Sequence, residues 1–236
     1  MFDYLSGILL IAVYFLIFAA AALLLRRPLK MHNEVFRKTL HMMLLGSIFP
    51  WIYFFEHWIT SVLSVISFAF IVYLVMLLCE YLPNFSELLM ERKKGEIRKS
   101  VLSVFAMIAI MITICWGLFG VRYYAIASVL AWGIGDAAAA VVGKTYGKHY
   151  LTGKLIEGRK TVEGCIAMCV ASFLSVTIVL LAYCAAPWYI VIPVAMLTAI
   201  VCTIVELFTK NGMDTVTCPF AAAAVMIPLI HFGIAG

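Results

Sequence analysis

Acidic side chains inside apolar sequence give the first sign of chemistry in this chain. Asp136 interrupts the run Ala131–Ala140, whose other members are apolar residues or glycine. An ionised carboxylate there costs about 2.5–3.5 kcal/mol to insert into a membrane, and acids within membrane-spanning helices usually mark functional sites. Gly133, Gly135 and the four alanines after Asp136 allow a neighbouring helix to approach closely. We therefore interpret Asp136 as part of a protein-lined site; a structural hydrogen bond between helices is the alternative.

A basic segment with several glycines follows Asp136. Residues 143–148 read Gly-Lys-Thr-Tyr-Gly-Lys, and the segment continues to Thr161. Glycine permits close backbone approach, and basic side chains neutralise phosphoryl oxygens. The expected ligand is therefore phosphate, bound by Lys144, Lys148, Arg159 and Lys160. The segment is no P-loop, because that motif needs a preceding strand and a glycine where Ala138 stands. An ordinary loop beside the membrane is the alternative.

The next apolar run opens with Lys-Thr-Val-Glu-Gly, residues 160–164. Thr161 can cap a helix at this point, and the amides and dipole of a helix start favour an anion. Asp136 lies near the end of one run and Glu163 at the start of the next, so we expect the two carboxylates at similar depth. Carboxylates beside phosphate-binding residues suit a Mg²⁺ ion that bridges a nucleotide. Alternatively, Glu163 only complements the helix dipole.

Two further acids return to the same region in this interpretation. Glu206 ends the seventh apolar run, and Asp214 lies in the turn before the eighth. We expect both as additional metal ligands at the same face of the membrane. Alternatively, Glu206 only lies at the membrane interface, and Asp214 only forms or caps the turn.

Polar residues near the N-terminus share one stripe of a predicted helix. Glu34, Lys38 and His41 are spaced i, i+4 and i+7, and Arg37 lies on the adjoining edge. Side chains at this spacing suit substrate binding, and His41 suits proton transfer. Alternatively, the first turns of this helix are amphipathic and exposed to solvent, which explains the presence of Glu34 and Arg37 equally well.

The composition sets the fold class. The chain of 236 residues is 65% hydrophobic and 12% charged, against about 45–50% and 25% in a soluble domain. It offers repeated runs near the roughly 20 residues that span a bilayer. We predict an all-α, polytopic membrane bundle forming a single domain, residues 1–236, in which the first run is a permanent helix and the second could be kinked at Gly46 and Pro50. The eight expected spans are Tyr4–Leu25, Thr39–Phe55, Ile59–Cys79, Val101–Phe119, Tyr123–Val142, Cys165–Ala185, Trp188–Val205 and Val216–Ala235.

The basic residues predict the orientation. Sixteen of the seventeen fall near residues 26–38, 80–100, 143–161 and 206–215, and only Arg122 falls elsewhere. Lysine and arginine accumulate in cytoplasmic loops, so the N-terminus is expected outside and the site inside the cell. The basic residues behind the net charge of +5 then set the orientation in the membrane and contact lipid headgroups. No nucleic-acid partner is expected. The seven cysteines lack metal-type spacing and are interpreted as small buried apolar residues.

In these motifs the chain resembles the membrane-bound, CTP-dependent lipid-alcohol kinases. That family includes dolichol kinase, phytol kinase and the yeast-type diacylglycerol kinase, and is similar to the phosphatidate cytidylyltransferases. The resemblance covers nearly the whole chain and rests on Glu34 to His41, Asp136 with residues 143–148, residues 160–164, Glu206, and Gly212 with Asp214. It implies CTP as phosphoryl donor, a divalent metal and a lipid hydroxyl as acceptor. One departure is Thr215, where the family usually has asparagine.

The predicted activity is therefore CTP-dependent phosphorylation of a polyprenol, a phytol-like isoprenoid or diacylglycerol. Asp136 and Glu163 would hold Mg²⁺, with Glu206 or Asp214, and His41 or a carboxylate would be the base. The phosphates and substrate would be bound by Lys144, Lys148, Arg159, Lys160, Thr161, Glu34, Arg37 and Lys38. Two alternatives remain: a cytidylyltransferase that makes a CDP-lipid and pyrophosphate, and an ion- or proton-coupled transporter that uses Asp136.

Overall fold

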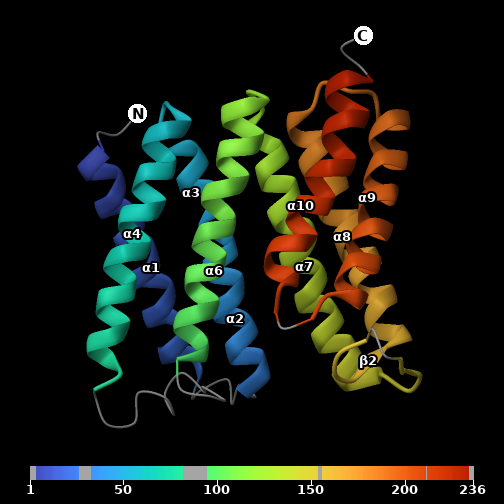
Figure 1. Ribbon diagram of the computed structural model, residues 1–236, viewed down its shortest axis with the longest axis horizontal. Helices are drawn as coiled ribbons and strands as arrows, with labels where there is room; N and C mark the ends of the chain where they lie inside the picture. The colour runs from blue at the N-terminus through green and yellow to red at the C-terminus, as the bar shows by residue number, and fades with distance from the viewer. Residues whose placement is uncertain (1–3, 27–32, 82–94, 154–155, 211, 234–236) are drawn as a thin grey trace. The chain divides into compact units, whose positions relative to one another are not determined.

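The protein is helical almost throughout (Figure 1). The computed structural model describes residues 4–26, 33–81, 95–153, 156–210 and 212–233. Its helices are α1 Tyr4–Arg26, α2 Asn33–Gly46, α3 Ile48–Tyr53, α4 Trp58–Cys79, α6 Glu96–Met111, α7 Arg122–Tyr146, α8 Val162–Tyr183, α9 Trp188–Phe208 and α10 Asp214–Met226. Two π-helical segments, Ile112–Leu118 and Ile227–Phe232, extend α6 and α10, and the strands are β1 Tyr150–Leu151 and β2 Lys160–Thr161.

Within the described residues, seven helices are long and apolar enough to cross a membrane. They comprise α1, α4, α6 and α7 to α10, with the π-helical extensions of α6 and α10 included. The predicted all-α, polytopic bundle is thus confirmed, and the chain is an integral membrane protein by the length and composition of these helices. The predicted orientation stays a prediction, and much of the expected loops near 26–38 and 80–100 lies outside the described residues.

The second expected span, Thr39–Phe55, is divided. The helix breaks at Ser47, which separates α2 from α3. Ser47 Oγ donates a hydrogen bond of 2.6 Å to the Leu44 carbonyl, and the Trp51 indole N–H donates one of 3.1 Å to Ser47 Oγ. The hydroxyl therefore satisfies polar groups at the break. Eight expected spans thus correspond to seven long helices and this divided pair.

The chain forms two compact units, residues 1–117 and 118–236. The first unit contains α1 to α6, and its core includes an aromatic group in which the rings of Phe15, Phe68 and Phe105 lie 5.0 to 6.0 Å apart. Arg98 and Glu80 form an ion pair of 3.1 Å where α6 begins and α4 ends.

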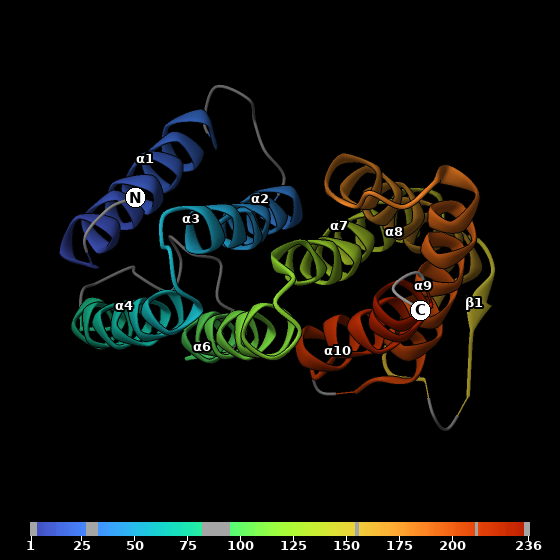
Figure 2. The same cartoon turned by 90° about the horizontal axis from the view of Figure 1, so that it is seen from above.

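The second unit is a four-helix bundle that carries a short hairpin. Helices α7, α8, α9 and α10 contact one another in this order, and α10 also contacts α7 (Figure 2). β1 and β2 pair antiparallel, with Tyr150 opposite Thr161 and Leu151 opposite Lys160. The basic segment 143–161 therefore begins as the last turn of α7, which runs to Tyr146, and then forms the hairpin that leads into α8.

Small residues bring α7 and α8 together, as expected around Asp136. A Cβ on Gly135 would collide with Ser172 Oγ, and one on Gly143 would lie 3.6 Å from Gly164 Cα. The Ser172 hydroxyl donates a hydrogen bond of 2.7 Å to the Ala131 carbonyl. Close backbone approach and a buried interhelical hydrogen bond are the two features that hold helices together in lipid.

Candidate functional site

An ion pair joins the hairpin to the end of α9. Lys160 Nζ lies 2.9 Å from Glu206 Oε1, and the same ammonium donates a hydrogen bond to the Glu206 carbonyl. The two side chains are only 20% and 14% exposed. The structure thus brings together two segments, 143–161 and 206–215, that the sequence assigned to one face.

A second contact brings the start of α10 to α7. The Trp132 indole N–H donates a hydrogen bond of 3.1 Å to Asp214 Oδ2. Trp132 is buried and lies four residues before Asp136, so the two side chains share one face of α7. Asp214 therefore lies beside the face of α7 that carries Asp136.

Three carboxylates gather around this contact. Asp136 and Asp214 lie close enough to Glu206 for their charges to act on it. We call Asp136, Glu206 and Asp214 the acid cluster. Like charges repel strongly where little water screens them. Lys160 pairs with Glu206, one member of the acid cluster.

A metal ion at the acid cluster stays a prediction. In the described part of the chain, no three His, Cys, Asp or Glu side chains lie close enough to form a complete ligand set. Mg²⁺ does not require such a set, because it usually takes one or two protein carboxylates and completes its shell with water and phosphate oxygens. A Mg²⁺ ion at the acid cluster would therefore need water or phosphate oxygens to complete its shell.

Glu163 has a different partner. His149 Nδ1 lies 2.7 Å from Glu163 Oε1, and the His149 backbone N–H donates to the same carboxylate, 3.3 Å from Oε1 and 3.4 Å from Oε2. The His149 carbonyl accepts a hydrogen bond of 3.0 Å from the Val162 N–H. Glu163 thereby fixes the hairpin to the first turn of α8. Sequence reasoning missed His149, although it directly follows Lys148.

The structure does not bring Asp136 and Glu163 together. Gly135 packs beside Met168 and Ser172, whereas Gly164 packs beside Ala139 and Gly143. In this antiparallel register Glu163 lies level with the region of Lys144, about eight residues or roughly 12 Å along α7 from Asp136. These contacts place the two carboxylates at different levels, against the expectation from the sequence. A metal ligand role for Glu163 stays a prediction.

Thr161 caps α8 as predicted. Its Oγ1 accepts a hydrogen bond of 3.1 Å from the Gly164 N–H, and the side chain is buried against Gly143 and Gly147. The cap holds the start of α8 against the last turn of α7. It thereby fixes the positions of Lys160 and Glu163 on either side of it.

The other predicted phosphate-binding residues are accessible. Lys144 in the last turn of α7, and Lys148 and Arg159 in the hairpin, all have exposed side chains. Their proposed contacts with phosphate stay predictions.

The predicted N-terminal residues lie in α2 of the first unit. Lys38 and His41 are partly buried there. The side chains of Glu34 and Arg37 lie outside the described residues. Their proposed roles in substrate binding and proton transfer stay predictions.

Comparison with known proteins supports one class of enzyme. No protein-family model matches the chain. The chain is 39% identical over 97 residues to a phytol kinase from Synechocystis sp.. This match supports the resemblance to the lipid-alcohol kinases. It covers 41% of this chain and 40% of the relative, so the chain matches about two fifths of the relative's length.

Proposed function

We propose that this protein is a membrane-bound kinase that phosphorylates the hydroxyl group of a long-chain lipid alcohol. The observation that carries the proposal is the 39% identity to a phytol kinase. The acid cluster and Lys160 support it, because they gather on helices that are suited to a membrane. By resemblance the donor is CTP, and the acceptors to be compared are phytol, polyprenols and diacylglycerol.

In this proposal the acid cluster binds the metal and the basic residues bind the phosphates. Asp136 would hold Mg²⁺ with Asp214 or Glu206, and Lys144 and Lys148 would contact phosphate oxygens. A bound Mg²⁺ neutralises charge on the phosphates as it develops. Lys160 offers a further positive charge beside the acid cluster, 2.9 Å from Glu206.

The proposed reaction is a single phosphoryl transfer. The oxygen of the lipid hydroxyl attacks the γ-phosphorus, the bond between that phosphorus and the bridging oxygen breaks, and CDP leaves. The hydroxyl proton passes to a base, for which the carboxylates of the second unit are the candidates. Positioning and charge neutralisation supply most of the catalysis in such transfers.

Product analysis tests the proposal. Purified protein would be incubated with Mg²⁺, phytol, polyprenol or diacylglycerol, and CTP labelled in either the γ-phosphate or the base. A kinase yields CDP and a γ-labelled lipid phosphate. Release of pyrophosphate with base label in the lipid would instead identify a cytidylyltransferase, and no product with any alcohol would refute both.

An isosteric variant tests the acid cluster. Asp136→Asn keeps the size of the side chain and removes its charge, so we expect turnover to fall by at least about 100-fold while the protein remains folded. Glu56→Gln is the matched control, because Glu56 is an exposed acid in the first unit. Unchanged turnover of Asp136→Asn would remove this carboxylate from the metal site.

A further inference from the structure

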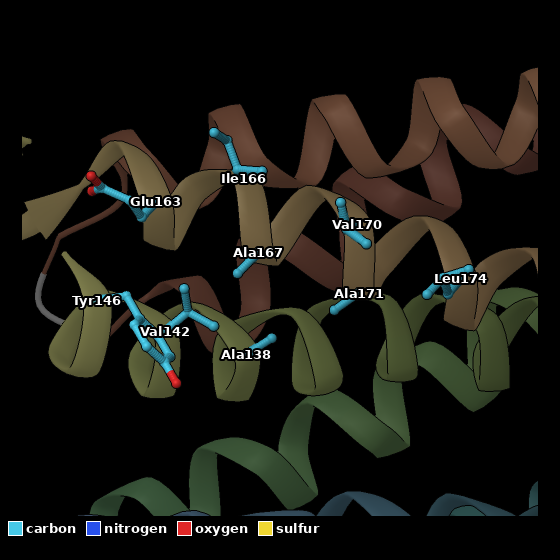
Figure 3. Close-up of a pocket in the computed structure, with 9 residues that line it drawn as sticks. All are labelled: Ala138, Val142, Tyr146, Glu163, Ile166, Ala167, Val170, Ala171 and Leu174. Carbon is cyan, nitrogen blue, oxygen red and sulfur yellow. The ribbon is translucent and has the colours of Figure 1, made fainter.

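The carboxylate of Glu163 is turned toward the hairpin. Figure 3 shows it at the start of α8, directed away from the apolar side chains that line the groove between α7 and α8. Its partners are two consecutive residues of the hairpin. His149 contributes its imidazole, with Nδ1 2.7 Å from Oε1, and its backbone N–H at 3.3 Å. The backbone N–H of Lys148 also stabilises this carboxylate. Backbone donors distinguish the contact from an ordinary surface ion pair, which by itself contributes little.

Gly147 holds the chain on the other side of Lys148. A Cβ on Gly147 would collide with the Gly143 carbonyl oxygen and with Thr161 Cγ2, so the chain passes too closely here for any other residue. The Gly147 N–H donates a hydrogen bond of 3.2 Å to the Gly143 carbonyl. The backbone of Lys148 is therefore fixed by close packing before it and by the contacts of His149 after it.

The hairpin by itself does not supply this rigidity. β1 and β2 comprise two residues each, and a two-stranded hairpin is at best marginally stable in water. Contacts with the start of α8 therefore hold β1 in place. The Val162 N–H donates a hydrogen bond of 3.0 Å to the His149 carbonyl, and the Glu163 carboxylate binds both the side chain and the N–H of His149. His149 is thus the residue through which α8 holds the segment that carries Lys148.

We propose that His149 is a positioning residue, which together with Glu163 holds the backbone of Lys148 so that its ammonium can bind a phosphate group of the nucleotide. The inference rests on the proposed function, in which Lys148 contacts phosphate oxygens. The Lys148 side chain is exposed, so its fixed backbone limits the positions that the ammonium can reach. A site whose backbone is already ordered loses less conformational entropy when it binds a ligand. Glu163 thereby has a role that needs no metal and that agrees with its separation from Asp136.

Nucleotide binding tests this role without requiring turnover. Calorimetry would measure the Kd of the full-length protein for CTP in the presence of Mg²⁺. We expect His149→Ala to raise the Kd about fivefold, the effect of releasing roughly one residue of backbone before binding. His149 is 78% exposed, so its replacement leaves the packing of the second unit intact. His149→Asn keeps a side-chain N–H donor and should restore most of the affinity. His57→Ala, at an exposed histidine of the first unit, is the matched control and should bind CTP as the wild type does.

A double-variant cycle separates positioning from general stability. If His149 acts through Lys148, His149→Ala should weaken binding in the wild type but not in Lys148→Ala, so the double variant should bind CTP as Lys148→Ala does. Equal weakening in both backgrounds, or an unchanged Kd for His149→Ala, would overturn the inference. Hydrogen exchange in peptides that contain His149 and Val162 should also become about fivefold faster in His149→Ala. Unchanged exchange would show that the pair does not hold the hairpin.

The outcomes separate this role from the activity. If the wild type phosphorylates a lipid alcohol but the effects of His149→Ala and Lys148→Ala on the Kd are additive, the proposed function stands and the positioning role fails. If CTP binds with the non-additive pattern but no alcohol is phosphorylated, the positioning role stands and the proposed function fails. A wild-type protein that does not bind CTP would refute both.

Discussion

Lys160 and Glu206 form a partly buried ion pair, 2.9 Å long, between the hairpin and the end of α9. They are 46 residues apart in the chain, and the same ammonium also donates to the Glu206 carbonyl. The pair fixes one basic residue of the hairpin beside the acid cluster. Its disruption should therefore affect the stability of the second unit and the binding of a cation there.

Removing Lys160 alone should destabilise the protein more than removing both partners. Lys160→Met leaves Glu206 as a poorly solvated, unpaired charge, which costs about 1–3 kcal/mol. Lys160→Met combined with Glu206→Gln removes that charge and should recover much of the loss. Thermal unfolding of both single variants and the double variant gives the coupling energy. Strictly additive effects would show that the two side chains do not interact in solution.

Trp132→Phe tests whether the indole positions Asp214. The variant keeps an aromatic ring and removes the N–H that donates to Asp214 at 3.1 Å. Such a bond contributes about 1 kcal/mol, so we expect the Mg²⁺ concentration for half-maximal activity to rise roughly fivefold. Trp51→Phe is the matched control, because its indole N–H donates to Ser47 in the first unit. An equal Mg²⁺ requirement in both variants would assign Trp132 a packing role only.

The sequence was sufficient to predict the membrane helices and the cap of α8. Long apolar runs and the order of their breaks are local properties, and Thr161 stands at the helix start that its sequence indicates. The break at Ser47 was only partly expected from Gly46 and Pro50. The hydrogen bond from the Trp51 indole to Ser47 Oγ involves side-chain geometry that the sequence does not express.

The sequence did not predict that Glu163 lies apart from the acid cluster. We expected α7 to end at Val142, but it continues through Gly143 to Tyr146. Gly143 lies within the helix and packs closely against Gly164 instead of forming a turn. This tertiary contact outweighs the low helix propensity of glycine. The resulting register of α7 against α8 separates Asp136 from Glu163. The Trp132 indole donates to Asp214, a residue 82 positions later in the sequence. Pairings at such separations depend on the packing of whole helices.

Lys144→Ala should weaken the binding of CTP. The side chain is exposed in the last turn of α7, where it can contact a phosphate. Loss of one charge-assisted contact costs about 1.5 kcal/mol, so the Kd for CTP should rise roughly tenfold, and the effect should shrink at high salt. Lys99→Ala, at an exposed lysine of α6, should leave the Kd unchanged. Equal affinity in wild type and Lys144→Ala, measured by calorimetry, would remove Lys144 from the phosphate site.

Gly135→Ala should loosen the contact between α7 and α8 beside Asp136. The added Cβ would collide with Ser172 Oγ, which is buried and bonded to the Ala131 carbonyl. Overpacking of this kind costs about 1–3 kcal/mol, which exceeds the helix propensity that alanine gains over glycine. Ser172→Ala removes the colliding oxygen, so the double variant should be more stable than Gly135→Ala alone in thermal unfolding. Because Gly135 adjoins Asp136, turnover should recover together with stability; a double variant as unstable as Gly135→Ala would show that another neighbour, such as Met168, sets the spacing of the two helices.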